Sequence, residues 1–336
     1  MFNLPNEVKL DLLKCLNFDQ LFNFRLINFY FNDFINKNEG ILARKEFYSI
    51  KAGSLLGKRY WPKGSKLIEH NLIEFGFCLD YKLNDQLIEK WRSSLNQRKH
   101  ISRPSFKNKF VITLLQRVNE RKFRNIFLEF CPRNVEEMKI ARYFLEQLFL
   151  CYFHEIDFEY YLISSKMINL LFDDDKTTKL KFSGHKAKLH YYEQINVLDF
   201  AVNHLLVDEL NIDFHEYKNP NQNENKSLLN LLMNQGARFK KINCRFSSTR
   251  GLFYSLINKI EASTNYLNIV AKIEIVATES FDIKLCARAK NKNKEGGIST
   301  FEVNNINNPK VKFFIKLWEH AERIVYRLQI RRILWN

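Results

Sequence analysis

The chain opens with three short stretches in which apolar residues recur at the spacing of an α-helix. In the first stretch, one face carries Val8, Leu12, Cys15 and Leu16. Pro5 suits the first turn of a helix because it has no N–H group to leave unpaired, and Glu7 brings negative charge close to the positive helix end. The pattern predicts an amphipathic helix here.

Two further helical stretches follow directly. Asp19 is a candidate N-cap for a helix that begins at Gln20. The apolar positions of that helix are Leu21, Phe24 and Ile27. The next run, from Phe29 to Ile35, is almost entirely aromatic or aliphatic. Three helices this short cannot bury so much apolar surface among themselves, so we expect an uncovered patch that serves as an interface.

From about Phe110 onward, the pattern changes to short runs in which apolar and polar residues alternate. Five such runs begin at Ile126, Ile156, Leu180, Leu210 and Ile242. Alternation with a period of two predicts strands, each with one buried face. Helical patterns fill the gaps between these runs, at Glu136–Leu150, Ser164–Phe172, Tyr191–Leu206 and Lys226–Gln235. Gly236 is a candidate C-cap for the last of these helices.

The strand and helix patterns recur at intervals of 24 to 32 residues. Such units suggest parallel strands stacked side by side, as in a solenoid, and the arrangement resembles an irregular leucine-rich-repeat horseshoe. A single α/β sheet with helices on both faces is the alternative. Either way we expect an α/β fold (α+β overall), with the repeat region at residues 121–260.

The strand residues that point away from the buried face form one candidate surface for a protein substrate. They include Glu129, Asp157, Glu159, Asn211, Asp213 and Arg245. This surface is acidic in the first two units and mixed afterwards. An acidic stripe repels phosphate, which argues against nucleic acid on this face.

The regions on either side of the repeats have other patterns. We expect residues 46–120 to form a helical, basic connector to the next domain, with predicted helices at Lys66–Phe77 and Asn84–Leu95 and a loop at His100–Lys109. The alternative is that these helices form a cap on that domain. Residues 261–336 should hold antiparallel strands and a basic terminal helix. The predicted elements there are a hairpin of Ile269–Ala277 and Phe281–Ala289 with its turn near Glu279-Ser280, an exposed loop at Lys290–Gly297, a strand at Ser299–Asn304, and a helix at Leu317–Leu334.

Residues 1–45 resemble an F-box. The resemblance rests on Leu4-Pro5-x-Glu7-Val8, Leu12-Leu13, Leu16, Leu21, Phe24-Arg25-Leu26-Ile27-Asn28 and Phe31. In that family the opening reads Leu-Pro-x-Glu and is followed by spaced leucines, a Leu-Arg-Leu-Val-Cys-like run and a Trp, where this chain has Phe31. The Phe- and Asn-rich composition of this stretch also resembles that of the large F-box families of nematodes. A generic amphipathic hairpin that packs on its own domain is the alternative.

The resemblance implies a substrate-recognition subunit of a cullin-RING ubiquitin ligase that performs no chemistry itself. The N-terminal helices would bind the Skp adaptor, and through it the cullin, while the repeat region would hold an unknown protein substrate. The residues that would contact the adaptor or support that contact are Leu4, Pro5, Glu7, Val8, Leu12, Leu16, Leu21, Phe24 and Phe31.

The charge of the chain leaves a second function open. The formal net charge is +16, from 53 Lys and Arg against 37 Asp and Glu. Much of the excess lies in Arg92–Arg124 and Pro309–Asn336. Basic segments are typical of nucleic-acid binding, although joint enrichment in Lys, Asn, Phe and Ile would give the same charge without any binding function. The alternative function is therefore a repeat-based interaction protein without a ligase role that binds nucleic acid through these segments.

Candidate chemistry is sparse. The six cysteines are scattered without a CxxC pair, and the eight histidines form no HExxH or similar cluster, so we expect no metal and no cofactor. Phosphate-binding and nucleophile motifs are absent, and we expect no enzyme activity. No apolar run approaches the length of a membrane span, and no signal peptide is recognisable, so we expect a cytoplasmic or nuclear location.

Overall fold

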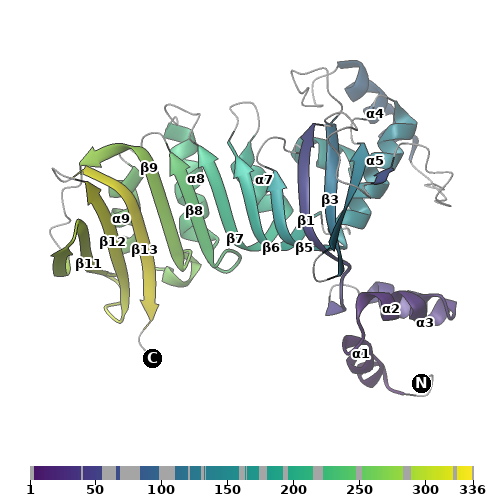
Figure 1. Ribbon diagram of the computed structural model, residues 1–336, viewed down its shortest axis with the longest axis horizontal. Coiled ribbons are helices and arrows are strands. Elements are labelled where there is room, and N and C mark those ends of the chain that lie inside the picture. Colours follow the sequence, from purple (N-terminus) through teal and green to yellow (C-terminus); the bar gives the residue numbers. More distant parts are fainter. Residues whose placement is uncertain are drawn as a thin grey trace.

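One long sheet crosses the molecule in the computed structural model, with helices behind it and three small helices below it, near the start of β1 (Figure 1). The structure describes residues 4–38, 41–54, 66–68, 84–97, 110–119, 122–129, 132, 134–158, 163, 165–173, 180–191, 196–214, 222–246, 252–282, 289–320 and 324–334. The sheet and its helices confirm the predicted mixed α/β architecture.

The N-terminal helices are α1 (Asn6–Lys14), α2 (Phe18–Arg25) and α3 (Phe29–Lys37). Asn17 caps α2 through a capping box: its side chain accepts from the Gln20 N–H, and the Gln20 side chain accepts from the Asn17 N–H. The predicted cap at Asp19 is wrong, because Asp19 already lies inside the helix. Asn28 caps α3 by accepting from the Phe31 N–H at 3.0 Å.

Six strands of the sheet run parallel to one another. They are β1 (Glu46–Ser54), β5 (Tyr152–Phe158), β6 (Phe182–His190), β7 (Leu205–Phe214), β8 (Lys241–Phe246) and β9 (Lys272–Asp282), in that spatial order. From β5 to β9, strands that follow one another in the chain are neighbours in the sheet. The parallel stack that the alternating patterns predicted is confirmed for the runs at Ile156, Leu210 and Ile242. It is confirmed for the run at Leu180 from Phe182 onward, because β6 begins there.

The helices between these strands form one layer on a single face of the sheet (Figure 1). They are α5 (Val135–Phe149), α6 (Ser165–Leu171), α7 (Val197–His204), α8 (Gln222–Asn234) and α9 (Leu252–Ala262). Helix α4 (Asp85–Gln97) joins this layer, where Trp91 Nε1 donates to the Leu170 carbonyl at 2.8 Å. The alternative prediction, a sheet with helices on both faces, is therefore wrong for the described residues. Among these residues, the face opposite the helix layer is open.

A buried triplet with the spacing apolar-x-x-apolar-x-apolar recurs along the parallel strands, and at β8 and β9 its first member lies just before the strand. The triplets are Phe47-Ile50-Ala52, Phe153-Ile156-Phe158, Gly184-Ala187-Leu189, Val207-Leu210-Ile212, Phe239-Ile242-Cys244 and Val270-Ile273-Ile275. Register pairs align the second members across the strands from Ile50 to Ile273. The alternation expected from the sequence is confirmed for Leu210-Ile212-Phe214 of β7 and for Ile242-Cys244-Phe246 of β8. The three-residue step precedes each of these runs and departs from the period of two.

The predicted helical connector at residues 46–120 is wrong in most of its described part. This region contains β1, β2 (Lys66–Ile68) and β3 (Phe110–Asn119) beside α4. The predicted helix at Lys66–Phe77 is therefore a strand at its start, and the rest of it lies outside the described residues. The predicted loop at His100–Lys109 also lies outside them. The predicted helix at Asn84–Leu95 is confirmed by α4. β4 (Lys122–Glu129) pairs antiparallel with β3, so the run at Ile126 does not join the parallel stack.

The C-terminal region extends the sheet beyond β9 with four antiparallel strands. They are β13 (Ile324–Leu334), β12 (Val311–His320), β11 (Ile298–Asn304) and β10 (Lys290–Glu295). The predicted terminal helix at Leu317–Leu334 is wrong. Alternate residues from Val311 to Leu317 are buried, and so are Leu328 and Ile330, which is the burial period of strands.

Two smaller predictions in this region are also wrong. Strand β9 runs without a break through Glu279-Ser280, where a turn was expected, and residues 283–288 lie outside the described residues. The expected loop at Lys290–Gly297 is instead strand β10, followed by a turn at Gly296 and Gly297. Both glycines have positive φ values, 55° and 74°, which glycine adopts without strain. The strand at Ser299–Asn304 is confirmed by β11.

Candidate functional site

The three N-terminal helices have a hydrophobic cluster of their own, separate from the main core. Its buried members are Leu13, Leu21, Ile35 and Leu42. Phe31 is also buried, and its ring meets Phe24 edge to face with 5.6 Å between centroids. This unit therefore folds around its own small core, ahead of β1.

Helix α1 turns an apolar row away from that core. Val8 and Leu12 lie four residues apart on α1, Leu4 lies just before the helix, and all three side chains are exposed. Pro5 and Glu7 beside them are exposed as well. On the adjacent face of α1, about 100° further round the helix, Lys9 and Leu13 are buried. An exposed row of aliphatic side chains at helical spacing is suited to a partner that packs along α1.

A second apolar group lies at the junction of α2 and α3. Leu26 is 70% exposed, Ile27 60% and Phe29 93%, and Tyr30 is also exposed. Burying one such side chain gains roughly 1.5–3 kcal/mol, so water contact at these positions is costly. Of the thirteen exposed large apolar side chains in the described residues, eight lie between Leu4 and Ile41. The N-terminal unit thus concentrates the uncovered apolar surface of the described chain.

The residues proposed for the adaptor contact divide into two groups. Leu4, Pro5, Glu7, Val8 and Leu12 are exposed, Leu16 and Phe24 are partly buried, and Leu21 and Phe31 are buried. Leu21 and Phe31 are buried, so they can support an adaptor contact only by packing in the core beneath the exposed residues. Sequence reasoning left out Leu26, Ile27 and Phe29 as contact residues, although the excess of apolar residues in this run was the available signal.

The open face of the sheet is the second candidate surface. Asp157, Asn211, Asp213 and Arg245 all lie on it, since they alternate with buried residues of β5, β7 and β8. Glu129 does not join them, because β4 is separated from β5 by β3 and β1. Glu159 lies outside the described residues. The structure therefore brings together four of the six residues proposed for substrate contact.

The acidic stripe expected on this face is not formed, because basic residues of neighbouring strands pair with the acids. Lys51 Nζ lies 3.1 Å from Asp157, and Lys188 Nζ lies 2.5 Å from Glu155. These partners belong to strands that are distant in the sequence but adjacent in the sheet. The expectation is thus corrected: the β1–β6 part of the open face carries alternating and largely compensated charge.

A polar row crosses the strands on the open face. It lies at the three-residue step, where two consecutive side chains, and not one, lie between the first and second buried residues of each triplet. His185 Nδ1 lies 3.4 Å and Lys240 Nζ 2.9 Å from the Asp208 carboxylate. The hydrogen bond from Lys240 holds the pKa of Asp208 below its ordinary value, and the same bond raises the pKa of Lys240. Tyr48 and His154 continue the row, with ring centroids 6.2 Å apart.

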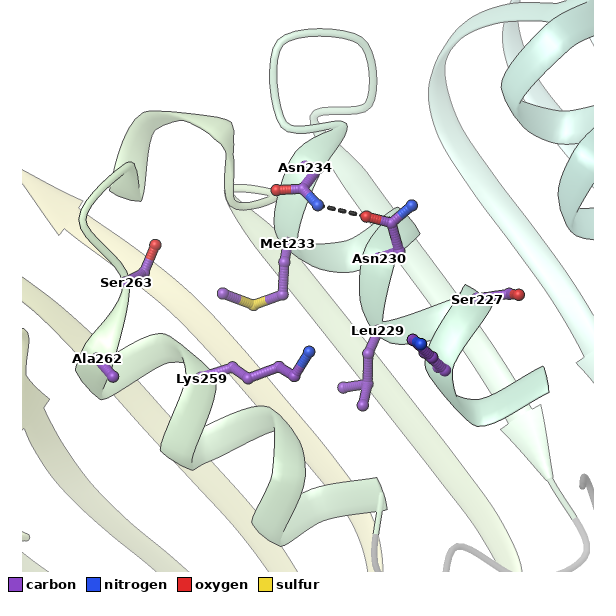
Figure 2. A pocket seen from close by; sticks show the side chains of 9 residues that line it. Ser227, Leu229, Asn230, Met233, Asn234, Lys259, Ala262 and Ser263 are labelled. Carbon is purple, nitrogen blue, oxygen red and sulfur yellow. Dashed lines mark hydrogen bonds between the residues drawn. The ribbon is translucent and has the colours of Figure 1, made fainter. Parts of the chain in front are cut away.

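A groove lies between α8 and α9 on the helix layer (Figure 2). Its volume is about 670 Å³, and its lining includes Lys226, Ser227, Leu229, Asn230, Met233, Asn234, Lys259 and Ser263. In Figure 2, the Lys259 side chain reaches across toward α8 beneath Met233. Asn234 donates a hydrogen bond to Asn230 along one side. The groove has no acid–base pair and offers a mixed polar and apolar wall.

Metal-binding groups do not converge in the part of the chain that the structure describes. No set of three His, Cys, Asp or Glu residues is placed there to hold a metal ion. The Cys244 thiol is buried, and burial raises its pKa to about 12, so it is a poor nucleophile at neutral pH. Within the same residues, no helix has the length and apolar character needed to cross a membrane.

Comparison with known proteins gives one family match. A family described as a domain of unknown function (DUF8381) matches residues 76–215. The match takes in α4 through β7 and leaves out the three N-terminal helices and the strands from β8 onward. Neither the curated proteins nor the solved structures give a significant match.

Proposed function

We propose that this protein is a non-catalytic substrate receptor of a cullin-RING ubiquitin ligase. Its N-terminal helices would bind the Skp adaptor, and its sheet would hold a protein substrate. The observation that carries the proposal is the exposed apolar row of Leu4, Val8 and Leu12 on a three-helix unit with a separate core. A partner that covers this row removes apolar surface from water, which favours binding.

The α2–α3 junction supports the same role. Phe29 and its exposed neighbours Leu26 and Ile27 add a second apolar group to the same small unit. Aromatic and aliphatic side chains that stand free in the monomer are typical anchors of a protein interface. An amphipathic hairpin that packs on its own domain would have covered these residues, and in the described structure they are uncovered.

We further infer that the parallel strands and their helices are leucine-rich-repeat-like units. The triplets from Phe47-Ile50-Ala52 to Val270-Ile273-Ile275 follow the Leu-x-x-Leu-x-Leu part of that consensus, with smaller or aromatic residues at some positions. Helices on one face and an open strand face on the other are typical of such repeats. The open face would then be the surface that receives the substrate, in the cytoplasm or the nucleus.

Co-purification with a Skp adaptor tests the proposal. The native chain should retain the adaptor, and a Leu4→Ala, Pro5→Ala double variant should lose most of it. Leu267→Ala with Ile306→Ala is the matched control, because these apolar residues are 55% and 54% exposed but lie outside the helical unit. Circular dichroism establishes that all three proteins are folded. An adaptor that is retained equally by both variants would contradict the proposed contact.

A further inference from the structure

One row of side chains on the open face is almost entirely basic. Register pairs connect Lys186 of β6, Glu209 of β7, Lys241 of β8, Lys272 of β9 and Arg331 of β13 in a continuous line across the sheet. Adjacent members stand about 4.8 Å apart, the usual spacing of neighbouring strands. We call these five residues the basic row. Their order places four cations beside one carboxylate.

The carboxylates near the basic row are already paired. Glu209 lies 3.7 Å from Lys241, Asp213 lies 3.9 Å from Arg245, and Glu274 lies 2.6 Å from Arg327. In contrast, the side chains of Lys186, Lys272 and Arg331 have no carboxylate partner among the described residues. The region from β6 to β13 therefore has a positive excess, unlike the compensated region around β1 and β5.

We propose that the basic row docks an extended acidic segment of a protein. If the chain is the substrate receptor proposed above, this acidic segment is its substrate class. Only the word substrate rests on that proposed function; the binding itself does not. The row spans about 19 Å, which corresponds to roughly six residues of extended chain. Every second side chain of such a segment faces the sheet, so about three Asp or Glu residues meet the free cations of the row.

The surroundings of the row favour protein over nucleic acid. Base stacking requires an accessible aromatic ring. Beside this face, the Trp318 ring is engaged by Lys316 Nζ at 4.8 Å and the Arg327 guanidinium at 4.5 Å, and Phe314, the register partner of Arg331, is only partly exposed. Glu209, Glu274 and Asp213 also interrupt the positive surface, which weakens the attraction for a continuous phosphate backbone. A mixed protein segment can place carboxylates at the free cations and other side chains elsewhere.

Binding of a defined peptide to the full chain tests this proposal. The probe is a fluorescein-labelled peptide of about ten residues in which Glu alternates with Ser, long enough to cross the row. A peptide with Gln in place of Glu is the uncharged control, and a labelled single-stranded RNA of similar length is the competing ligand class. Fluorescence anisotropy at low salt measures each affinity.

Two double variants localise the contact. Lys272→Gln with Arg331→Gln removes two of the three free cations of the row, whereas Lys226→Gln with Lys259→Gln removes the same charge from the helix layer at the groove of Figure 2. We expect the native chain to bind the Glu peptide and not the Gln peptide. The row variant should bind at least about fivefold more weakly, because two screened ion pairs are lost, and the helix-layer variant should bind as the native chain does.

Other outcomes would overturn the proposal. No binding of the Glu peptide, equal losses in both double variants, or tighter binding of the RNA would each do so, and the last would make this face a nucleic-acid surface. The test is independent of the adaptor, because the peptide is added to the isolated chain. Loss of peptide binding in the row variant with normal adaptor retention therefore separates this proposal from the ligase role.

Discussion

Lys9 of α1 donates a hydrogen bond from Nζ to Tyr30 Oη of α3 at 2.6 Å, and the same ammonium lies 4.9 Å from the centre of the Tyr30 ring. Lys9 is only 5% exposed, while Tyr30 is 41% exposed, so this contact is partly shielded from water. The pair fastens α1 to α3 at the base of the exposed row of Leu4, Val8 and Leu12. The geometry of the proposed adaptor surface depends on it.

Replacement of Lys9 by Met tests this dependence. The variant keeps the apolar stem but removes the ammonium, and we expect a loss of about 1–2 kcal/mol in the stability of the three-helix unit. Hydrogen exchange of the α1 amides should therefore become faster while the β5–β8 amides stay protected. Lys14→Met is the control, because Lys14 pairs only with Asp11 at the surface. Equal exchange in native and Lys9→Met protein would contradict the fastening role.

Gly184 allows β5 and β6 to approach each other. A Cβ atom at Gly184 would lie 2.4 Å from the Phe153 carbonyl oxygen, a backbone atom that cannot move aside alone. We expect Gly184→Ala to lower the free energy of unfolding by about 1–3 kcal/mol. Urea denaturation measures this loss.

Gly53 provides the matched control for that substitution. It also lies in a parallel strand, and a Cβ atom there would meet nothing within 4 Å. Gly53→Ala should be neutral or slightly stabilising, since alanine restricts the unfolded chain. If both variants lose the same stability, the close approach at Gly184 is not the cause.

Arg332 joins the last strand to the turn that precedes β9. One of its terminal nitrogens lies 2.6 Å from the Tyr266 carbonyl and 2.9 Å from those of Leu267 and Ile269. We expect Arg332→Met to cost about 1.5–3 kcal/mol, because carbonyl groups lose a charged donor. Thermal unfolding of this variant and of Arg331→Met, whose side chain is exposed, gives the comparison. A matching loss in Arg331→Met would contradict the assignment.

Cys244 should be chemically silent in the folded protein. Its pKa is raised from 9.0 to about 12, so almost no thiolate exists at pH 8, whereas Cys15 is exposed. Iodoacetamide at pH 8 should modify Cys15 and spare Cys244, as read by mass spectrometry of the digested protein. A buried thiol with a raised pKa also removes stability as the pH rises above 9 toward 12, because the unfolded chain ionises first. Rapid labelling of Cys244 in folded protein would refute its burial.

The sequence predicted those elements whose pattern is local. The α1 face of Val8 and Leu12 and the alternation of Leu210 and Ile212 both arise within a few residues, so period alone identified a helix and a strand. The β1 strand was missed because its buried residues Phe47 and Ile50 are separated by the three-residue step. That step breaks the period of two over most of a short strand.

The C-terminal error has a different physical reason. Arg327 and Arg331 lie four residues apart, as on one helix face, yet they also lie on one face of a strand. The β-branched residues Ile324, Val325 and Ile330 favour the strand, and pairing with β9 and β12 decides it. Such pairing is a tertiary effect that a single segment does not reveal.

The charge of the open face also depended on tertiary structure. Asp157 was expected to contribute to an acidic surface, but Lys51 of β1 compensates it. Lys51 belongs to a segment that was predicted to be helical, so its proximity could not be foreseen. In contrast, the exposed apolar surface of the N-terminal helices was foreseen, because it follows from the number of apolar residues that short helices can bury.

Calorimetric titration of a Skp adaptor into the full chain tests the proposed ligase role most directly. The account predicts binding by the native chain and by Leu206→Asp, an exposed apolar position on β7. Val8→Asp with Leu12→Asp should weaken binding roughly a hundredfold, because two apolar anchors of the α1 row become charged. A native chain that does not bind, or a double variant that binds as tightly as the native chain, would contradict the account.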